Sequence, residues 1–468
     1  MDVLIKNGIV VTAEGHYPAD VAIEGEKIAA IVSPGVITEA DKIIDAAGKF
    51  VVPGAIDTHT HIEEPFQGLT PDEDWTAGTR NAAMGGVTTV LNFSIQDPGA
   101  PLLDVIRRHK KRAGELSCID FNHHGVFSDY TDIKKVVAEI PDLFAEGVVS
   151  LKAFMIYTAD GIYADDWSLY NLMRAMKEYG GFIGLHAENQ GIGENMQFEF
   201  IEQGKIESKY WPMTKPNFVE AEAVSRACIL AEETGCNMYI VHTSTKEAVE
   251  IIDRYREKGL PIHSETCAHY LAFDESLYEK EGVGVWEIIS PPLRKKADQE
   301  ALWEGIVNGP VCIMGSDHNA YGKVPKDAGY KEKGFKGVSN GGPGVMEGMG
   351  YLFAEGVNKG RLTLERFVEV TSTNAAKMFG LYPQKGTISA GSDADIVLID
   401  PEAEMTFGEA LYEDMDWTPY EGMTIKGCPV MTMLRGKVIM ENGEFKGGKG
   451  QGRFIPAKMD PELVKTIR

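Results

Sequence analysis

The sequence predicts an α/β protein in which a (β/α)8 TIM-like barrel is inserted into a small β-sandwich domain formed by both chain ends. Two observations predict this fold. Short apolar runs alternate with segments of helix length through the middle of the 468-residue chain, which is typical of a barrel of parallel strands. β-rich runs with a glycine at a turn occur near both termini, so the two ends are expected to form one sheet domain.

The terminal runs set the expected domain boundaries. VLIKNGIVVTAEG lies near the start, GTISAGSDADIVLIDPE spans residues 386–402, and VMTMLRGKVIMENGEF lies near the end. We therefore predict a composite β-sandwich domain from residues 1–52 and 385–450. The catalytic barrel is expected over residues 53–384, followed by a C-terminal tail over residues 451–468.

The eight predicted barrel strands are nearly continuous apolar runs, as expected of parallel strands that are buried on both faces. In chain order they are GAIDTHT, VTTVLNF, CIDFNHHGV, VVSLKAF, GFIGLHA, CNMYIVHT, LPIHSETC and VCIMGSD. Catalytic groups of such barrels lie at the C-terminal ends of the strands. The polar residues where these runs end are therefore expected to converge on one face.

Five of these run ends carry side chains that are charged or can bind a metal ion. They are His59 and His61, Lys152, His186, His242 and Asp317. Residues two apart on a strand point to the same face, so the first two imidazoles project together. An isolated pair of this kind would be two half-buried strand histidines, but the convergence favours a metal site. One catalytic zinc takes about three protein ligands, so this set fits two divalent ions about 3.5–4 Å apart better.

Lys152 is the unusual member of this set. A free lysine has a pKa of about 10.4, and its ammonium group would be repelled by two divalent cations. The side chain therefore either reaches away toward solvent or is modified to an anion. Reaction of the neutral amine with CO₂ gives N6-carboxylysine, a carbamate whose two oxygens can bridge two metal ions. The position of Lys152 among the strand ends favours the carbamate.

Several motifs occur together in a fixed order: PGAIDTHTHIEEPF, GTRNAAMGGVTTV, SLKAFMIY, LHAEN, VHTS, SPPLR and GSDH. Over nearly the whole chain, this set resembles the dihydropyrimidinase/hydantoinase (cyclic amidohydrolase) family of the amidohydrolase superfamily. The resemblance implies two Zn²⁺ ions bridged by a carboxylated Lys152. One ion would be bound by His59, His61, Lys152 and Asp317, and the other by Lys152, His186 and His242.

The resemblance also implies a reaction. A metal-bridging hydroxide would attack the ring amide carbonyl of a hydantoin or dihydropyrimidine, and the product would be an N-carbamoyl amino acid. Asp317 would take the hydroxide proton and pass it to the leaving nitrogen, and Tyr157 would stabilise the oxyanion. The main chains of Ser290 and Asn340 would hold the cyclic amide. Family members are often homotetramers, so a homo-oligomer is expected.

Four other functions on the same fold are distinguished by individual residues of this sequence. Dihydroorotases resemble HxHLREPG after the first strand, whereas Glu63 stands here in place of the carboxylate-binding arginine, which disfavours that activity. Glu64-Pro65 keeps an allantoinase-like enzyme as the runner-up. A non-catalytic dihydropyrimidinase-related binding protein would lack metal ligands, which are all present here. A mononuclear deaminase is a weaker alternative, because it would not require Lys152.

Two departures from the family pattern leave the ring substrate open. Dihydropyrimidinases usually carry a cysteine after the SDH element, where this chain has Asn319-Ala320-Tyr321. The stretch FMIYTAD also replaces a more usual alanine-tyrosine-lysine ending. Five further histidines lie at or next to these runs and could orient the metal ligands from behind, but they are interpreted as ordinary core or surface residues. They are His123, His124, His263, His269 and His318.

The amino-acid composition and the cysteine pattern limit the classes of binding partner and the expected location of the protein. Asp and Glu number 70 against 46 Lys and Arg, for a net charge of −24, which argues against nucleic acid and anionic membrane surfaces. The start MDVLIKNGIVV lacks the pattern of a secretory signal, and the six cysteines are scattered without a CxxC pair, as in a reduced protein. A cytoplasmic protein with a small-molecule substrate is expected.

Overall fold

Two sheets organise the chain in a computed structural model that describes residues 1–468, apart from the side chain of Glu409. The first is an eight-stranded parallel sheet in the order β13-β12-β11-β10-β9-β8-β7-β6. Its strands are β6 (Ala55–Thr60), β7 (Val87–Ile95), β8 (Asp120–Val126), β9 (Ser150–Phe154), β10 (Phe182–His186), β11 (Asn237–Ile240), β12 (Ile262–Cys267) and β13 (Val311–Gly315). Each lies within one of the eight apolar runs, so the predicted strands are confirmed.

The sheet is nearly closed, because its first and last strands meet just beyond their C-terminal ends. Thr60 forms a parallel bridge with His318, and the N–H of His61 donates to the carbonyl of His318 at 2.9 Å. The predicted (β/α)8 barrel is thereby confirmed. Its closure joins the loop after β13 to the end of β6.

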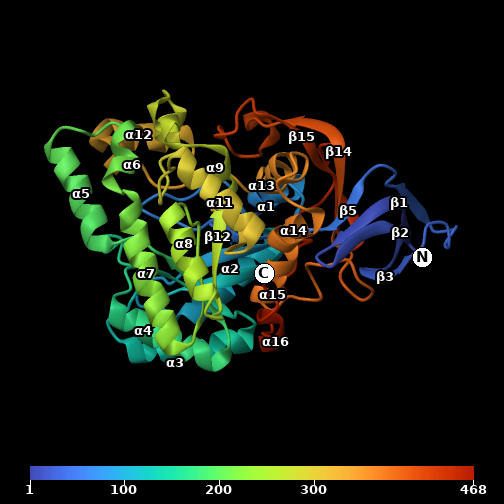
Figure 1. Ribbon diagram of the computed structural model, residues 1–468, viewed down its shortest axis with the longest axis horizontal. Helices are drawn as coiled ribbons and strands as arrows, with labels where there is room; N and C mark the ends of the chain where they lie inside the picture. The colour runs from blue at the N-terminus through green and yellow to red at the C-terminus, as the bar shows by residue number, and fades with distance from the viewer.

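Helices surround the barrel (Figure 1). The long ones are α1 (Trp75–Met84), α2 (Leu102–Leu116), α3 (Ile133–Glu146), α4 (Asp166–Tyr179), α5 (Gln190–Glu202), α7 (Asn217–Thr234), α8 (Lys246–Arg256), α11 (Lys296–Asn308) and α12 (Lys323–Lys333). Shorter helices are α6 (Trp211–Thr214), α9 (Ala268–Ala272), α10 (Val283–Trp286), α13 (Gly348–Leu352), α14 (Leu364–Val368), α15 (Asn374–Met378) and α16 (Pro461–Val464). Among the described residues, none of them has the length and apolar character that a membrane span needs.

Local sequence explains how helix and strand alternate. The carboxylate of Asp74 accepts from the N–H groups of Thr76 and Ala77 and so caps the start of α1, as aspartate does at helix N-termini. The helix ends at Met84, and Gly85-Gly86 turns the chain into β7. Gly86 has a φ of +90°, which a residue with a side chain rarely adopts.

The second sheet has nine strands and is built from both chain ends. Its strand order is β17-β16-β15-β14-β5-β1-β2-β3, with β4 paired to β1. Its N-terminal strands are β1 (Val3–Thr12), β2 (Gly15–Glu24), β3 (Lys27–Val32), β4 (Lys42–Asp45) and β5 (Phe50–Pro53). Its C-terminal strands are β14 (Ile396–Thr406), β15 (Thr424–Leu434), β16 (Lys437–Glu441) and β17 (Glu444–Phe445). Figure 1 shows β1–β3 at one end of the molecule, opposite α5.

The two chain ends join where β5 pairs antiparallel with β14, with Val52 opposite Val397. Inward-facing side chains from both halves, including Val10, Val21 and Met433, pack into one buried core. This apolar interior is what a β-sandwich requires. The separate terminal sheet predicted from the sequence is thus present.

A buried ion cluster links this sheet to the barrel. The ammonium of Lys385 lies 2.5 Å from Asp120, 3.0 Å from Asp393 and 2.5 Å from Asp395, and Arg435 also pairs with Asp120. Burial alone would lower the pKa of Lys385, but the three carboxylates outweigh it and raise that pKa. Because Asp120 belongs to β8 and Asp395 directly precedes β14, the cluster joins the two domains.

Replacing Lys385 should therefore destabilise the whole chain. Lys385→Met leaves buried carboxylates without their cation, and we expect a loss of about 3–5 kcal/mol in the free energy of unfolding. Urea denaturation at pH 7 measures this loss. The loss should shrink near pH 4, because the unpaired carboxylates take up protons more readily in the folded variant than in the unfolded chain.

Lys27→Met is the matched control. Lys27 pairs with Asp393 at 2.6 Å, but its side chain is 49% exposed, so the change should cost less than about 1 kcal/mol. Equal losses in the two variants would contradict a special role for the buried cluster.

Candidate metal centre and active site

The barrel brings the six predicted metal ligands to one end. His59 lies in β6, Lys152 in β9 and His186 at the end of β10, while His61, His242 and Asp317 follow β6, β11 and β13 by one or two residues. All are buried except for a partly exposed Asp317. This is the C-terminal face on which barrel active sites lie.

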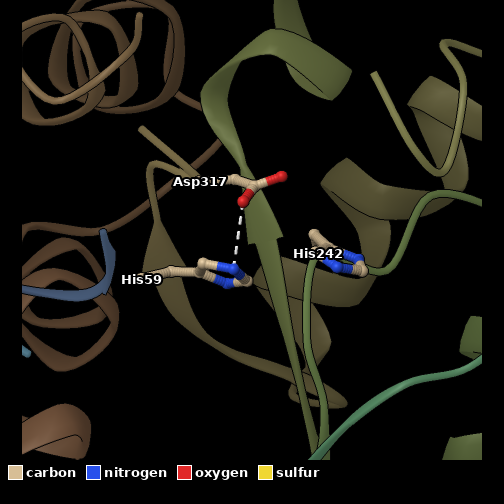
Figure 2. Close-up of side chains that lie close together, drawn as sticks. All are labelled: His59, His242 and Asp317. Carbon is tan, nitrogen blue, oxygen red and sulfur yellow. Dashed lines mark ion pairs between the residues drawn. The ribbon is translucent and has the colours of Figure 1, made fainter. Parts of the chain in front are cut away.

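Asp317 stands at the centre of this group. Its Oδ1 lies 3.0 Å from Nε2 of His59 and 3.4 Å from Nε2 of His61. Figure 2 shows the His59 ring pointing at this carboxylate and His242 approaching from the other side. One ligand atom each from His59, His242 and Asp317 lies within 4.8 Å of the others. Such spacing lets one small ion contact all three.

His186 and Lys152 complete the group. The imidazole centroids of His186 and His242 are 4.5 Å apart, and Nζ of Lys152 lies 3.0 Å from Nε2 of His59. Lys152 therefore lies inside the cluster and does not extend to solvent.

The protonation states of His61, His186, His242 and Asp317 suit a divalent metal, whereas at His59 burial is outweighed by Glu265 and Asp317, which raise its pKa. Burial lowers the pKa of both His61 and His186 to about 4 and that of His242 well below its ordinary value, so these imidazoles are neutral. Burial would raise the pKa of Asp317, but His59 and His61 hold it well below its usual range. Neutral imidazoles and an ionised carboxylate are the forms that bind divalent metals, so the residues fit a metal centre.

Lys152 has an unusual environment for a cation. Burial lowers its pKa to about 8, and its Nζ lies over the rings of Phe93 and Phe154, at 4.2 Å and 4.8 Å from their centroids. At neutral pH this raises the share of the uncharged amine compared with a free lysine. The uncharged amine is the form that can react with CO₂.

Glu265 is a functional residue that the motif analysis missed. From β12, its Oε1 accepts from Nδ1 of His59 at 2.5 Å and from the backbone N–H of His242 at 3.1 Å. Its Oε2 accepts from the hydroxyl of Thr58 at 2.7 Å. Bonding at Nδ1 leaves Nε2 of His59 facing the site, which is how carboxylates orient metal-binding imidazoles. The sequence feature that could have indicated this role is the presence of an acidic residue, Glu265, inside a predicted buried strand.

A second missed group surrounds His186 and Ser290. Oε2 of Glu188 lies 2.7 Å from Nε2 of His186 and accepts from the ammonium of Lys215 at 2.8 Å and from the hydroxyl of Ser290 at 2.6 Å. Burial would raise the pKa of Glu188, but Lys215 and His186 outweigh it and lower that pKa. Since Nε2 of His186 is engaged, Nδ1 is the ring atom left for a metal.

The three predicted substrate residues line the same pocket as the ligands. Tyr157, Ser290 and Asn340 form its wall together with Lys152 and Asp317. Burial holds the pKa of Tyr157 well above its ordinary value, so the phenol stays protonated and can donate. The N–H of Asn340 already donates to Oε1 of Gln67 at 3.1 Å, which leaves its carbonyl to meet a ligand.

Three site residues adopt a left-handed backbone. The φ angles are +77° at Tyr157, +36° at His242 and +51° at Asp317. Each such residue without a glycine's freedom costs about 1–3 kcal/mol, a kind of strain that clusters at functional sites. Motif spacing could not have predicted these conformations.

Glu63, which stands in place of the carboxylate-binding arginine of dihydroorotases, pairs with a cation of this chain. Its two carboxylate oxygens accept from the guanidinium of Arg112 at 2.9 Å and 2.7 Å. It is also absent from the described lining of the pocket. The missing arginine therefore disfavours a dihydroorotase, whereas the Glu63 carboxylate is engaged by Arg112.

The remaining histidines have structural environments. His124 is buried, 2.5 Å from the Ser150 hydroxyl and 2.9 Å from the Thr58 carbonyl. His318 lies 2.7 Å from Glu73, and its Nδ1 accepts from the N–H of Gly344. His123, His263 and His269 are also buried. These contacts agree with the interpretation of these residues as core histidines.

Known proteins share this architecture over nearly the whole chain. The D-hydantoinase of Geobacillus stearothermophilus is 40% identical over 97% of this chain and 96% of its own length. The L-hydantoinase of Paenarthrobacter aurescens is 33% identical over 97% of this chain and 98% of its own length. Relatives named for opposite enantiomers are thus both similar to this chain.

Solved structures agree with these relatives. The dihydropyrimidinase from Brevibacillus agri superposes with a TM-score of 0.93 at 37% identity, covering 98% of this chain and 99% of its own. The sequence model of the Amidohydrolase family matches residues 50–439, which include every residue assigned above to the metal centre and the pocket. The chain therefore belongs to the amidohydrolase family.

Proposed function

We propose that this chain is a metal-dependent hydrolase that opens the ring of a hydantoin or dihydropyrimidine to an N-carbamoyl amino acid. One observation carries the proposal. A single pocket is lined by metal-competent side chains together with Tyr157, Ser290 and Asn340, in a chain similar to hydantoinases over nearly its whole length. We further propose that it acts in the cytoplasm, which its scattered cysteines favour, and that it forms a homotetramer, as members of its family often do.

The family assignment implies a metal centre, and we propose two Zn²⁺ ions. His59, His61 and Asp317 would hold one ion, His186 and His242 the other, and a carboxylated Lys152 would lie between them. When bound, such ions lower the pKa of water and polarise a carbonyl oxygen. The low pKa and the enclosed position of Lys152 support its carboxylation.

Asp317 is proposed as the group that moves the proton. Its carboxylate stays ionised because His59 and His61 stabilise the negative charge, so it can accept a proton from the attacking water. Ring opening then needs a proton at the departing nitrogen, and the same carboxyl group can return it. A positioned acid–base of this kind contributes about 10²–10⁴-fold to a rate.

The pocket wall would hold the ring. The protonated phenol of Tyr157 would donate to the carbonyl oxygen as negative charge develops there. The carbonyl of Asn340 would accept a ring N–H, because its own N–H is engaged by Gln67. Ser290 would contribute its main chain, because its hydroxyl is committed to Glu188.

A substrate panel with a Lys152→Ala control tests the proposal. Metal-replete protein should open dihydrouracil or 5-substituted hydantoins, offered as separate enantiomers, and Lys152→Ala should lose both bound metal and turnover. Metal analysis by mass spectrometry and product assays measure the two effects. Lys135→Ala, at a side chain that is 84% exposed, should change neither.

The outcomes separate the candidate functions. Turnover of allantoin alone would favour the allantoinase-like runner-up. A Lys152→Ala protein that keeps two metal ions and full activity would reject the carbamate bridge.

Asp317→Asn should leave the protein folded but inactive. The amide cannot accept and return a proton, so we expect kcat to fall by about 10²–10⁴ in metal-replete protein whose melting temperature stays near that of the wild type. Steady-state kinetics and circular dichroism measure this pair of effects. A kcat near the wild-type value would reject the proton-transfer role.

Tyr157→Phe should lower kcat by about 10²–10³, as expected when one donor to a developing oxyanion is lost. Tyr239→Phe is the matched control, because Tyr239 is a buried tyrosine whose hydroxyl has no hydrogen-bond partner among the described residues. If both variants kept wild-type kcat, Tyr157 would be a structural residue.

A further inference from the structure

Lys326 is a buried lysine outside the metal centre that the proposed reaction does not use. It lies in α12 and its side chain is fully buried, at 0% exposure. Ordering and burying a lysine ammonium is costly unless its donors are satisfied. The groups that accept hydrogen bonds from those donors therefore indicate the role of Lys326.

Three backbone carbonyls accept hydrogen bonds from Nζ of Lys326. They belong to Trp286 at 2.6 Å, Ser339 at 3.1 Å and Gly341 at 2.5 Å. An ammonium has three N–H donors, so these contacts use all of them. Lys326 thereby cross-links two segments that are far apart in the sequence.

Both segments carry residues of the pocket wall. Ser339 and Gly341 flank Asn340 on either side, and Trp286 lies a few residues before Ser290 in the sequence. The N–H of Gly341 also donates to the carbonyl of Ile288 at 3.3 Å. The hydrogen bonds of Lys326 thus tie together the two main chains proposed to hold the ring and fix the distance between them.

Glu287 is the acidic group that opposes the desolvation of this lysine. Its carboxyl group is buried. Burial lowers the pKa of Lys326 to about 7 and raises that of Glu287 to about 8, although each group favours the charged form of the other. A Cβ added at Gly342 would lie 2.8 Å from its Oε2, so the carboxylate lies directly against the loop that follows Asn340. The Lys326 and Glu287 side chains thus both lie against the backbone of residues 339–342 from within the protein.

We propose that Lys326 is a positioning residue that fixes the main chains of Ser290 and Asn340 at the separation needed to hold the cyclic amide. It contacts neither metal ligands nor substrate and acts through the two segments. The inference rests on the proposed function, because only a ring amide bound between these main chains gives their separation a catalytic meaning.

The test uses Lys326→Met, which keeps the length of the side chain but removes every donor. We expect KM for the best ring substrate to rise by about tenfold or more, as for loss of a well-aligned hydrogen bond. Values of kcat should change less than about threefold, because losing contacts that are equally strong in the ground state and the transition state raises KM and leaves kcat unchanged. Metal content should stay at the wild-type value. The control is Lys331→Met, at an exposed lysine of the same helix.

A second variant guards against misfolding. Lys326→Met leaves the buried Glu287 carboxyl group without its nearby lysine, so the double variant Lys326→Met/Glu287→Gln removes both titratable groups at once. It should fold, keep its metal ions and still show the raised KM. A folded double variant with wild-type KM would overturn the proposal.

Hydrogen–deuterium exchange separates this inference from the proposed function. Peptides covering residues 335–342 should exchange faster in both Lys326 variants than in the wild type, and peptides covering β6 should be unchanged. Unchanged exchange over residues 335–342 would overturn the positioning role even if the wild type opened none of the rings. Faster exchange over residues 335–342 in both variants, together with a wild type that opens none of the rings, would overturn the proposed function alone.

Discussion

Closure of the barrel between β6 and β13 is the constraint on which the site depends. The bond from the His61 N–H to the His318 carbonyl joins the first strand to the last. It thereby places His59 and His61 against Asp317. Parallel strands leave their C-terminal ends on one face, so the other ligands arrive there without further arrangement. The ligand set is a consequence of topology more than of local sequence.

Bringing these groups together in a buried place has an electrostatic cost, and carboxylates behind the ligands offset it. Glu265 stabilises and orients His59, and Glu188 does the same for His186 while pairing with Lys215. A buried carboxylate without such partners would take up a proton instead. The outer groups therefore fix both the orientation and the protonation of the inner ones.

The sequence was sufficient for the strands and the inner ligands, because buried parallel strands are continuous apolar runs and the ligands lie where those runs end. It was insufficient for Glu265 and Lys326, whose partners come from segments distant in the sequence. It also could not predict the left-handed backbones of Tyr157 and Asp317, because tertiary contacts impose them. Glu63 shows the same limit, since its pairing with Arg112 depends on how α2 packs.

The pairing of β5 with β14 has a consequence for how the chain is made. Val52 and Val397 are roughly 340 residues apart, so at about 5–20 residues per second the ribosome needs about 20–70 s to deliver the partner strand. During that interval the N-terminal strands present an open hydrogen-bonding edge, a known template for misassembly. Until residues 396–399 have been made, this edge of β5 has no native partner strand.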